Sequence, residues 1–135
     1  MAAVARATVT ELAGLERIAG DGVATLRAPE IGLVMVRGRI GGDGAPFNLG
    51  EATVTRAAVS LPGGEVGFGH VLGRDKEKAR LAALADALWQ APATRDAVEA
   101  LLKPVRERLA DEAALRRERA AATRVDFFTM VRGDN

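Results

Sequence analysis

The sequence predicts an α+β fold: an antiparallel sheet of about four strands, an N-terminal helix, two or more C-terminal helices and an extended C-terminal tail. Two observations lead to this fold. Segments rich in β-branched residues and separated by glycine and proline turns fill residues 23–72, and leucines at helical spacing dominate only after Arg74. With 135 residues, the chain fits a single domain over residues 1–124 and a tail over residues 125–135.

The N-terminal helix is predicted over residues 8–19, where apolar residues recur at helical spacing. Thr8 and Glu11 stand three residues apart, as in a capping box, and mark the start of this helix. Gly20 opens a glycine-rich stretch that ends it.

The first half of the sheet is predicted from residues 23–61. Residues 23–40 are rich in Val, Ile and Leu, and we interpret them as two strands broken at Pro29. The glycines of residues 41–50 predict a loop, and residues 51–61 predict a longer strand.

The last strand follows a tight hairpin turn with the sequence PGGE. In this strand Phe68 and His70 alternate with Gly67 and Gly69, so the two glycines are expected on one face. Glycines on one face of a strand indicate that a helix or a partner packs closely there. His70 then falls on an apolar face, where a lone histidine is expected to be a hydrogen-bonded core residue.

Two helices are predicted after the sheet. A leucine stripe indicates the first over residues 75–90, with Asp75 as its N-cap. The second follows Pro92, and Pro104 lies inside its apolar pattern, which predicts a kink or a split. Beyond Leu109 the sequence is charged and alanine-rich, typical of a solvated helix face or a protein-docking surface.

The composition excludes several kinds of chemistry. Without cysteine there is no disulfide, thiolate nucleophile or thiolate-ligated cluster, and one histidine makes a histidine metal site a poor prospect. A formal net charge of +1 gives no overall attraction to nucleic acid or an anionic membrane, so neither is expected as a partner. No apolar run is long enough for a membrane span or a signal peptide, and we therefore expect a cytoplasmic protein. We also expect that the chain binds no cofactor by itself.

Three basic residues are weak candidates for a catalytic or phosphate-binding role. Arg74 and Lys76 flank the start of the helix over residues 75–90, where free amide groups favour an anion, although both side chains can equally be solvated. Arg56 lies at the centre of a strand, where it either reaches a phosphoryl group or pairs with an acidic residue across the sheet. The glycine-rich hairpin before Arg74 matches neither nucleotide-binding motif, so close packing is the simpler interpretation. No catalytic constellation is complete.

The tail is unusually apolar for a chain terminus. Two of the four phenylalanines in the sequence stand side by side in it. We expect an extended segment that leaves the domain and buries its side chains in a neighbouring subunit; folding back onto its own sheet is the other possibility. The predicted partner-binding residues are Phe127, Phe128, Met130, Val131 and Arg132.

Four blocks of the sequence resemble the PhnG subunit family of the bacterial carbon–phosphorus lyase system. They read FNLGEATVTRAAV, GHVLGRDKEKA, ALADALWQ and RVDFFTMVRGDN, and the resemblance runs from about residue 4 to the end of the chain. It implies a subunit of a multi-subunit transferase in phosphonate catabolism, in which alkylphosphonate displaces adenine from ATP to give α-D-ribose 1-methylphosphonate 5-triphosphate.

The same resemblance implies the partners. These are PhnH-, PhnI- and PhnJ-like subunits and a PhnL-like protein, with methylphosphonate and ATP as substrates of the complex. The active site is not expected within this chain, whose implied role is that of a scaffold or of a subunit that completes a site on a partner. The other hypothesis is a small nucleotide- or phosphate-binding module that uses the glycine-rich hairpin and the GRDK helix start.

Overall fold

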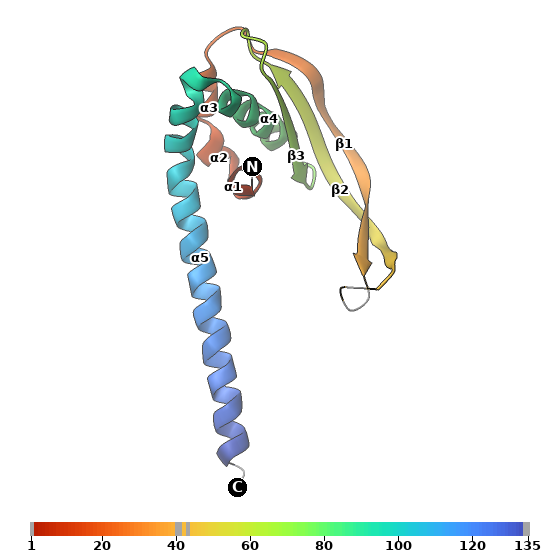
Figure 1. Ribbon diagram of the computed structural model, residues 1–135, viewed down its shortest axis with the longest axis vertical. Helices are drawn as coiled ribbons and strands as arrows, with labels where there is room; N and C mark the ends of the chain where they lie inside the picture. The colour runs from red at the N-terminus through yellow and green to blue at the C-terminus, as the bar shows by residue number, and fades with distance from the viewer. Residues whose placement is uncertain (1, 40–41, 43, 134–135) are drawn as a thin grey trace.

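A three-stranded antiparallel sheet, one helix packed on it and one long helix make up most of the molecule (Figure 1). The computed structural model describes residues 2–39, 42 and 44–133, with side chains as far as Arg124. The fold is α+β with sheet and helices segregated, as the sequence predicts. The elements are α1 (Ala2–Arg6), α2 (Val9–Leu12), α3 (Leu15–Ala19), β1 (Ala24–Arg39), β2 (Pro46–Ser60), β3 (Val66–Leu72), α4 (Lys76–Gln90) and α5 (Pro92–Gly133).

The sheet has the order β1-β2-β3, with both neighbouring pairs antiparallel. The expected break at Pro29 is wrong, because one strand of 16 residues, β1, runs through it. The pairing with β2 shifts register between Arg27 and Glu30, which lets the chain pass a residue that has no N–H to donate. An edge strand tolerates proline in this way, so the sheet has three strands where about four were expected.

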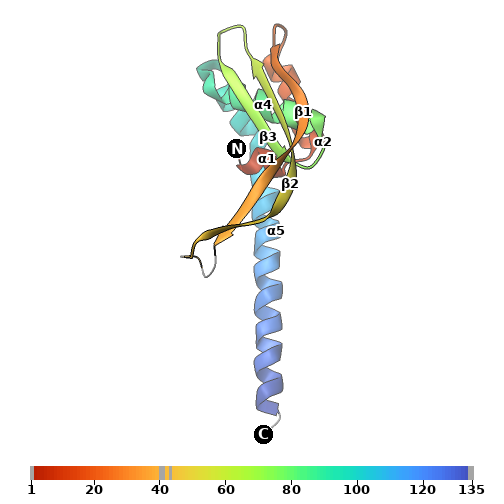
Figure 2. The same cartoon turned by 90° about the vertical axis from the view of Figure 1, so that its right-hand side faces the viewer.

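The glycine-rich segment predicted as a loop is also partly strand. Residues 46–50 open β2 and pair with the end of β1, where Arg39 faces Pro46 and Val36 faces Gly50. The β1–β2 hairpin is therefore much longer than β3, and its far end extends beyond the rest of the sheet (Figures 1 and 2).

Helix α4 covers the sheet on the glycine side of β3, which confirms the predicted close packing. A Cβ on Gly67 would lie 2.0 Å from the carbonyl oxygen of Ala83, and one on Gly69 would lie 2.2 Å from that of Ala79. Only glycine lets the helix backbone approach this closely. Asp75 caps α4 as predicted, because its carboxylate accepts a hydrogen bond from the Lys78 amide at 3.0 Å. The leucines of α4 are buried between the sheet and the other helices.

The N-terminal segment forms three short helices instead of the one predicted. The capping box is confirmed: Thr8 accepts from the Glu11 amide, and the Glu11 carboxylate accepts from the Thr8 amide. The segment turns at Gly14, where an added Cβ would lie 2.8 Å from Leu101 Cδ1 of α5. The bend lets Leu12 and Leu15 both reach the core, where they are fully buried.

Helix α5 is continuous from Pro92 to Gly133. Of the kink or split expected at Pro104, the split is absent: the helix runs through the exposed proline, and Leu102 and Val105 on either side of it are buried. Beyond Val105 no described side chain as far as Arg124 is fully buried, and the helix extends away from the body (Figures 1 and 2).

The prediction of an extended tail is wrong, because the same helix continues into the tail. Residues 125–133 continue α5. The alanine-, arginine- and glutamate-rich segment before them has high helix propensity, and a helix that has begun adds further residues easily. No glycine or proline interrupts residues 105–132, and this local preference outweighs the β-branched and aromatic residues of the tail.

Candidate functional site

The face of the sheet opposite α4 is uncovered. Because Gly67 and Gly69 face α4, the alternating side chains of Phe68 and His70 lie on the other side, where both are exposed. Phe68 is 57% exposed. The expectation that His70 belongs to the core is therefore wrong: His70 is exposed, and Ala2 and Ala5 of α1 only border a depression beside it and Phe68.

Arg56 lies at the centre of this face, in register with Glu30 of β1 and His70 of β3. Its guanidinium Nη2 lies 3.3 Å from Glu30 Oε1, and Arg27 Nη1 lies at the same distance from the same oxygen. Cross-strand pairing, one of the two predicted roles of Arg56, is thus observed. Both contacts are longer than a typical charge-assisted hydrogen bond, and two guanidiniums share one carboxylate.

A cavity of about 310 Å³ lies beside this cluster. Arg56 Nε is buried within the structure without a hydrogen-bond acceptor. The excess of donors over acceptors suits an acidic or phosphate group, and the arrangement provides charge and position but no nucleophile paired with a base. The residues that line the cavity are Leu26, Arg27, Arg56, Ala57, Ala58, Phe68 and His70.

Arg74 and Lys76 lie elsewhere, at the start of α4, and neither lines the cavity beside Arg56. Both side chains are exposed, and Asp75 between them already occupies the Lys78 amide at the helix start. The structure therefore does not bring the three basic candidates into one cavity. A role for any of them in contacting substrate stays a prediction.

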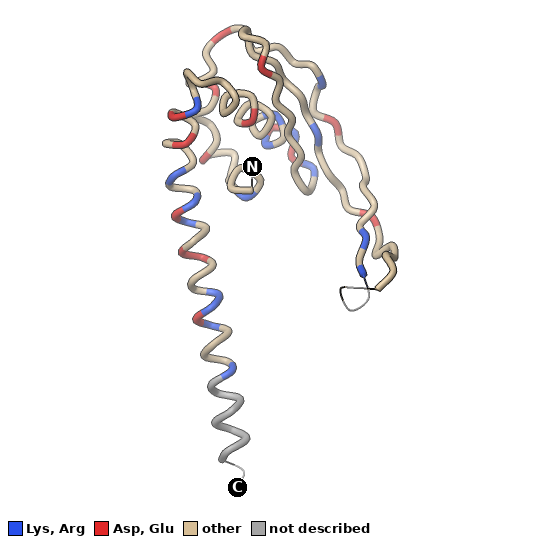
Figure 3. Tube along the Cα trace, viewed as in Figure 1, with Lys and Arg blue, Asp and Glu red and all other residues tan. Residues whose placement is uncertain are grey.

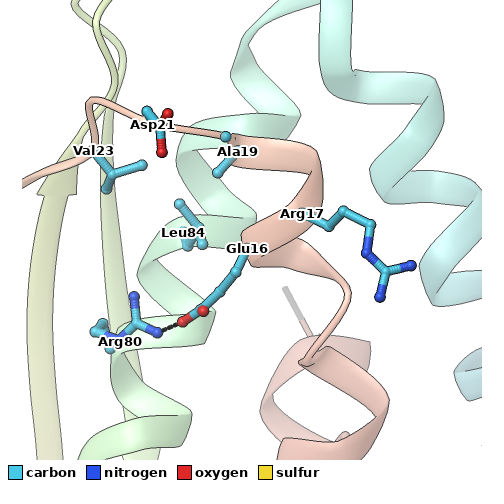
Figure 4. Close-up of a pocket in the computed structure, with 8 residues that line it drawn as sticks. Glu16, Arg17, Ala19, Asp21, Val23, Arg80 and Leu84 are labelled. Carbon is cyan, nitrogen blue, oxygen red and sulfur yellow. Dashed lines mark ion pairs between the residues drawn. The ribbon is translucent and has the colours of Figure 1, made fainter.

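A second depression, of about 380 Å³, lies between α3 and α4 (Figure 4). Glu16 of α3 forms an ion pair with Arg80 of α4 across it, and Arg80 also bonds Glu77 at 3.1 Å. Arg17 and Asp21 add one charge of each sign to the lining. Paired charges of this kind hold two helices together and leave no excess charge for a ligand.

The single tryptophan sits in a third site, which serves the packing of α4 against α5. Trp89 Nε1 donates to Glu99 Oε1 at 2.7 Å, and the Arg95 guanidinium stacks 4.6 Å from the ring centroid. Hydrogen bonds from Arg106 and then from Trp89 hold the pKa of Glu99 below its ordinary value. Each polar group here already has a partner within the chain.

The largest feature that the sequence did not predict is the apolar far end of the β1–β2 hairpin. Leu33, Met35 and Leu49 are each more than half exposed. The sequence pattern was ambiguous there, because a continuous apolar run such as LVMV equally fits a strand buried on both faces.

The predicted partner-binding side chains lie outside the part of the chain whose side chains are described. Phe127, Phe128, Met130, Val131 and Arg132 belong by their backbone to α5, and their burial in another chain stays a prediction. Among the described residues, no group of three or more His, Asp or Glu gathers as metal ligands. No helix in the described chain is both long and apolar enough to cross a membrane.

Fold and surface together define a class of protein: a small α+β chain with an uncovered sheet face, a protruding apolar hairpin and a protruding helix. Such surfaces are typical of a component of a larger assembly. The family model "Phosphonate metabolism protein PhnG" matches residues 1–133. The chain is also 58% identical to a Rhizobium meliloti protein described as "Alpha-D-ribose 1-methylphosphonate 5-triphosphate synthase subunit PhnG", over all of this chain and 88% of that protein. The chain belongs to the PhnG family.

Proposed function

We propose that this chain is a subunit of an α-D-ribose 1-methylphosphonate 5-triphosphate synthase and acts in the breakdown of phosphonates. The observation that carries the proposal is the 58% identity, over the whole chain, to a relative described as a subunit of that synthase. The reaction joins an alkylphosphonate to the ribose of ATP with loss of adenine. The protein works in the cytoplasm and holds no cofactor of its own, with ATP entering as a substrate of the complex.

In this proposal the partners are PhnH-, PhnI- and PhnJ-like subunits and a PhnL-like protein. The chain serves as a scaffold that completes or orients a site formed mainly on a partner. Two features of the structure support this role: the surface is uncovered and apolar over much of the sheet, and Arg56 lies in a small cavity with unmatched positive charge. Displacement at an anomeric carbon needs positioning and stabilisation of a highly charged triphosphate.

A nucleotide-binding module that acts alone is supported less well by the geometry. The backbone of α4 occupies the space beside the glycines that would have to hold a phosphate. Added Cβ atoms at Gly67 and Gly69 would lie within 2.2 Å of carbonyl oxygens of this helix. The helix start after Arg74 is capped by Asp75. Isothermal titration of the isolated chain with ATP is expected to give no binding at millimolar nucleotide.

The test of the synthase role is reconstitution. The chain is co-expressed with the PhnH-, PhnI- and PhnJ-like proteins of its source, the PhnL-like protein is added, and product is followed by ³¹P NMR with ATP and methylphosphonate. We expect the ribose 1-methylphosphonate 5-triphosphate to form only when this chain is present. Equal rates without it would remove the chain from the synthase.

A further inference from the structure

The far end of the β1–β2 hairpin is a two-stranded ribbon, which we call the hairpin arm. It consists of residues 33–39 of β1 and residues 46–53 of β2. β3 pairs with β2 only from Val54 onward, so the arm has no third strand, and it lies beyond the reach of the helices (Figures 1 and 2). A two-stranded ribbon by itself is marginally stable in water, and we therefore expect another chain to pack against the arm.

Over residues 33–36 the β1 strand of the arm is apolar and exposed on both faces, and among the β2 residues of the arm only Glu51, which faces Met35, is charged. Leu33 and Met35 point to one face, 65% and 56% exposed, while Val34 and Val36 point to the other, 40% and 38% exposed. Phe47 and Leu49 on β2 add to this surface. A strand that packs on one side only shows alternation of apolar and polar residues, so the absence of alternation indicates contact on both sides.

The outer edges of β3 and of the arm differ in how far their backbone groups are already hydrogen-bonded. Along β3, the Phe68 N–H donates to Asp86 Oδ2 at 3.0 Å, and the Val66 carbonyl accepts from Gln90 Nε2 at 2.8 Å. These α4 side chains occupy backbone groups that an added strand would need. From Pro46 to Ala52, in contrast, no described hydrogen bond reaches the outer edge of β2. Contact with another chain is thus hindered at β3 and open at the arm.

We propose that the hairpin arm inserts into an apolar groove of a different subunit of the synthase, a groove that grips both faces and carries carboxylates at its mouth. The inference rests on the proposed function, because it requires that the chain be part of an assembly. The six exposed apolar side chains present on the order of 600 Å² of surface, most of the ~800 Å² that each partner contributes to a standard interface. These side chains are Leu33, Val34, Met35, Val36, Phe47 and Leu49.

Charge selects a different subunit over a second copy of this chain. Arg37 and Arg39 are exposed at the described end of the arm, and Glu51, which faces Met35 across the two strands, is the one acidic residue of residues 33–39 and 46–53. Figure 3 shows the end of β1 in the colour of basic residues. A two-fold dimer through the arm sets the same patch against itself and brings four guanidiniums together with only two carboxylates, which leaves an excess of positive charge in a desolvated interface. Carboxylates on a heterologous groove pair with the two arginines instead.

The test compares two substitutions in the co-expressed full-length complex, Leu33→Asp in the arm and Ala97→Asp near the start of α5, away from the sheet. Leu33 is 65% exposed and Ala97 is exposed as well, so both variants are expected to fold, which circular dichroism checks. We expect Leu33→Asp to lower recovery of the other subunits at least tenfold and Ala97→Asp to leave it within about twofold. Equal loss, or no loss, in both variants overturns the proposal.

A charge-reversed variant, Arg37→Glu with Arg39→Glu, keeps the test independent of any packing change. It is expected to weaken assembly, and the difference from the wild-type chain should shrink as salt is raised. The mass of the isolated chain, measured at rising concentration, shows whether the arm binds a second copy of this chain. A monomer at all concentrations supports binding to a different subunit. Self-association that Leu33→Asp abolishes overturns the proposal. If the wild-type chain recovers no subunit at all, the proposed function fails instead.

Discussion

At the scale of single residues, the distance between α4 and the sheet is set by two missing Cβ atoms. Gly67 and Gly69 let the backbone of α4 lie directly on β3, with Ala79, Ala83 and Ala87 as the facing residues. Small residues on both sides bring helix and strand closer than larger side chains permit. The alternation of glycines predicted this contact from the sequence, because it depends on nothing beyond the strand period.

Replacing Gly67 with alanine is expected to destabilise the fold strongly. The new Cβ would lie 2.0 Å from Ala83 O and 2.5 Å from Ala87 N, both backbone atoms that move only with the whole helix. We expect a loss of at least about 2 kcal/mol in the free energy of unfolding, as for overpacked cores, measured by urea denaturation. The matched control is Gly32→Ala on β1, where the nearest atom is Arg56 Nη2 at 3.9 Å. Similar losses in both variants would show that backbone freedom, not close packing, explains the glycine.

His70 shows where residue-level prediction stopped. Its position in an alternating strand was predictable, but the face on which it lies is uncovered. Whether a face is buried depends on which elements pack there, and the sequence of β3 is equally compatible with cover on either side.

At the scale of elements, the N-terminal helices are tied to α5 by one ion pair between residues 97 positions apart. Arg108 of α5 donates from Nε to Glu11 Oε2 at 3.0 Å and from Nη2 to Glu11 Oε1 at 2.8 Å. Arg108 also reaches the carbonyl of Arg6 at 3.2 Å, so a single side chain contacts α1 and α2. The capping box places the Glu11 carboxylate for this contact.

The ion pair predicts a specific dependence of stability on pH. The hydrogen bond from Arg108, and then the Thr8 amide, lower the pKa of Glu11 from 4.5 to about 2. A carboxylate with a lowered pKa in the folded state stabilises it fully above pH 4.5 and loses this effect as the pH falls toward 2. Glu11→Gln should therefore lower the thermal midpoint at pH 7 and match the wild-type chain near pH 2. Thermal unfolding monitored by circular dichroism across this range measures it.

The control for that series is Glu112→Gln, which removes the other carboxylate bonded to Arg108. Glu112 lies one turn away on the same helix, so its loss breaks no link between elements. Its thermal midpoint should stay close to that of the wild-type chain throughout. If Glu11→Gln lowers the thermal midpoint by the same amount at pH 7 and at pH 2, the charge of Glu11 does not explain its contribution to stability.

The elements that the sequence predicted well are those with local determinants: the Asp75 cap, the Thr8–Glu11 capping box and the leucine stripe of α4. The two errors in the sheet share one physical origin, which is long-range pairing. β1 passes Pro29 because β2 holds it on both sides of the irregularity, and residues 46–50 become strand because β1 offers partners. Neither effect leaves a trace in the local pattern.

At the scale of the whole molecule, two parts leave the compact body: the hairpin arm and the far half of α5 (Figure 1). Along α5, basic and acidic residues alternate as far as the described side chains go (Figure 3), and Leu115 among them is 46% exposed. A helix that is polar on most sides is either stabilised by ion pairs along its own length or bridges to another domain or chain. The apolar residues of the tail stand at the end of this helix, where a partner would meet them.

Deleting residues 125–135 should separate folding from assembly. The described core ends with Val105 on α5, so the truncated chain is expected to keep the thermal midpoint of the full-length chain. Burial of Phe127 and Phe128 in a neighbouring subunit would contribute about 3–6 kcal/mol before ordering costs, and a loss of 3 kcal/mol weakens binding more than a hundredfold. We therefore expect the truncated chain to recover almost none of its co-expressed partners, with Thr123→Ala, a change at an exposed position of the same helix, as the control. Full recovery by the truncated chain would leave the hairpin arm as the anchor and remove the tail from the interface.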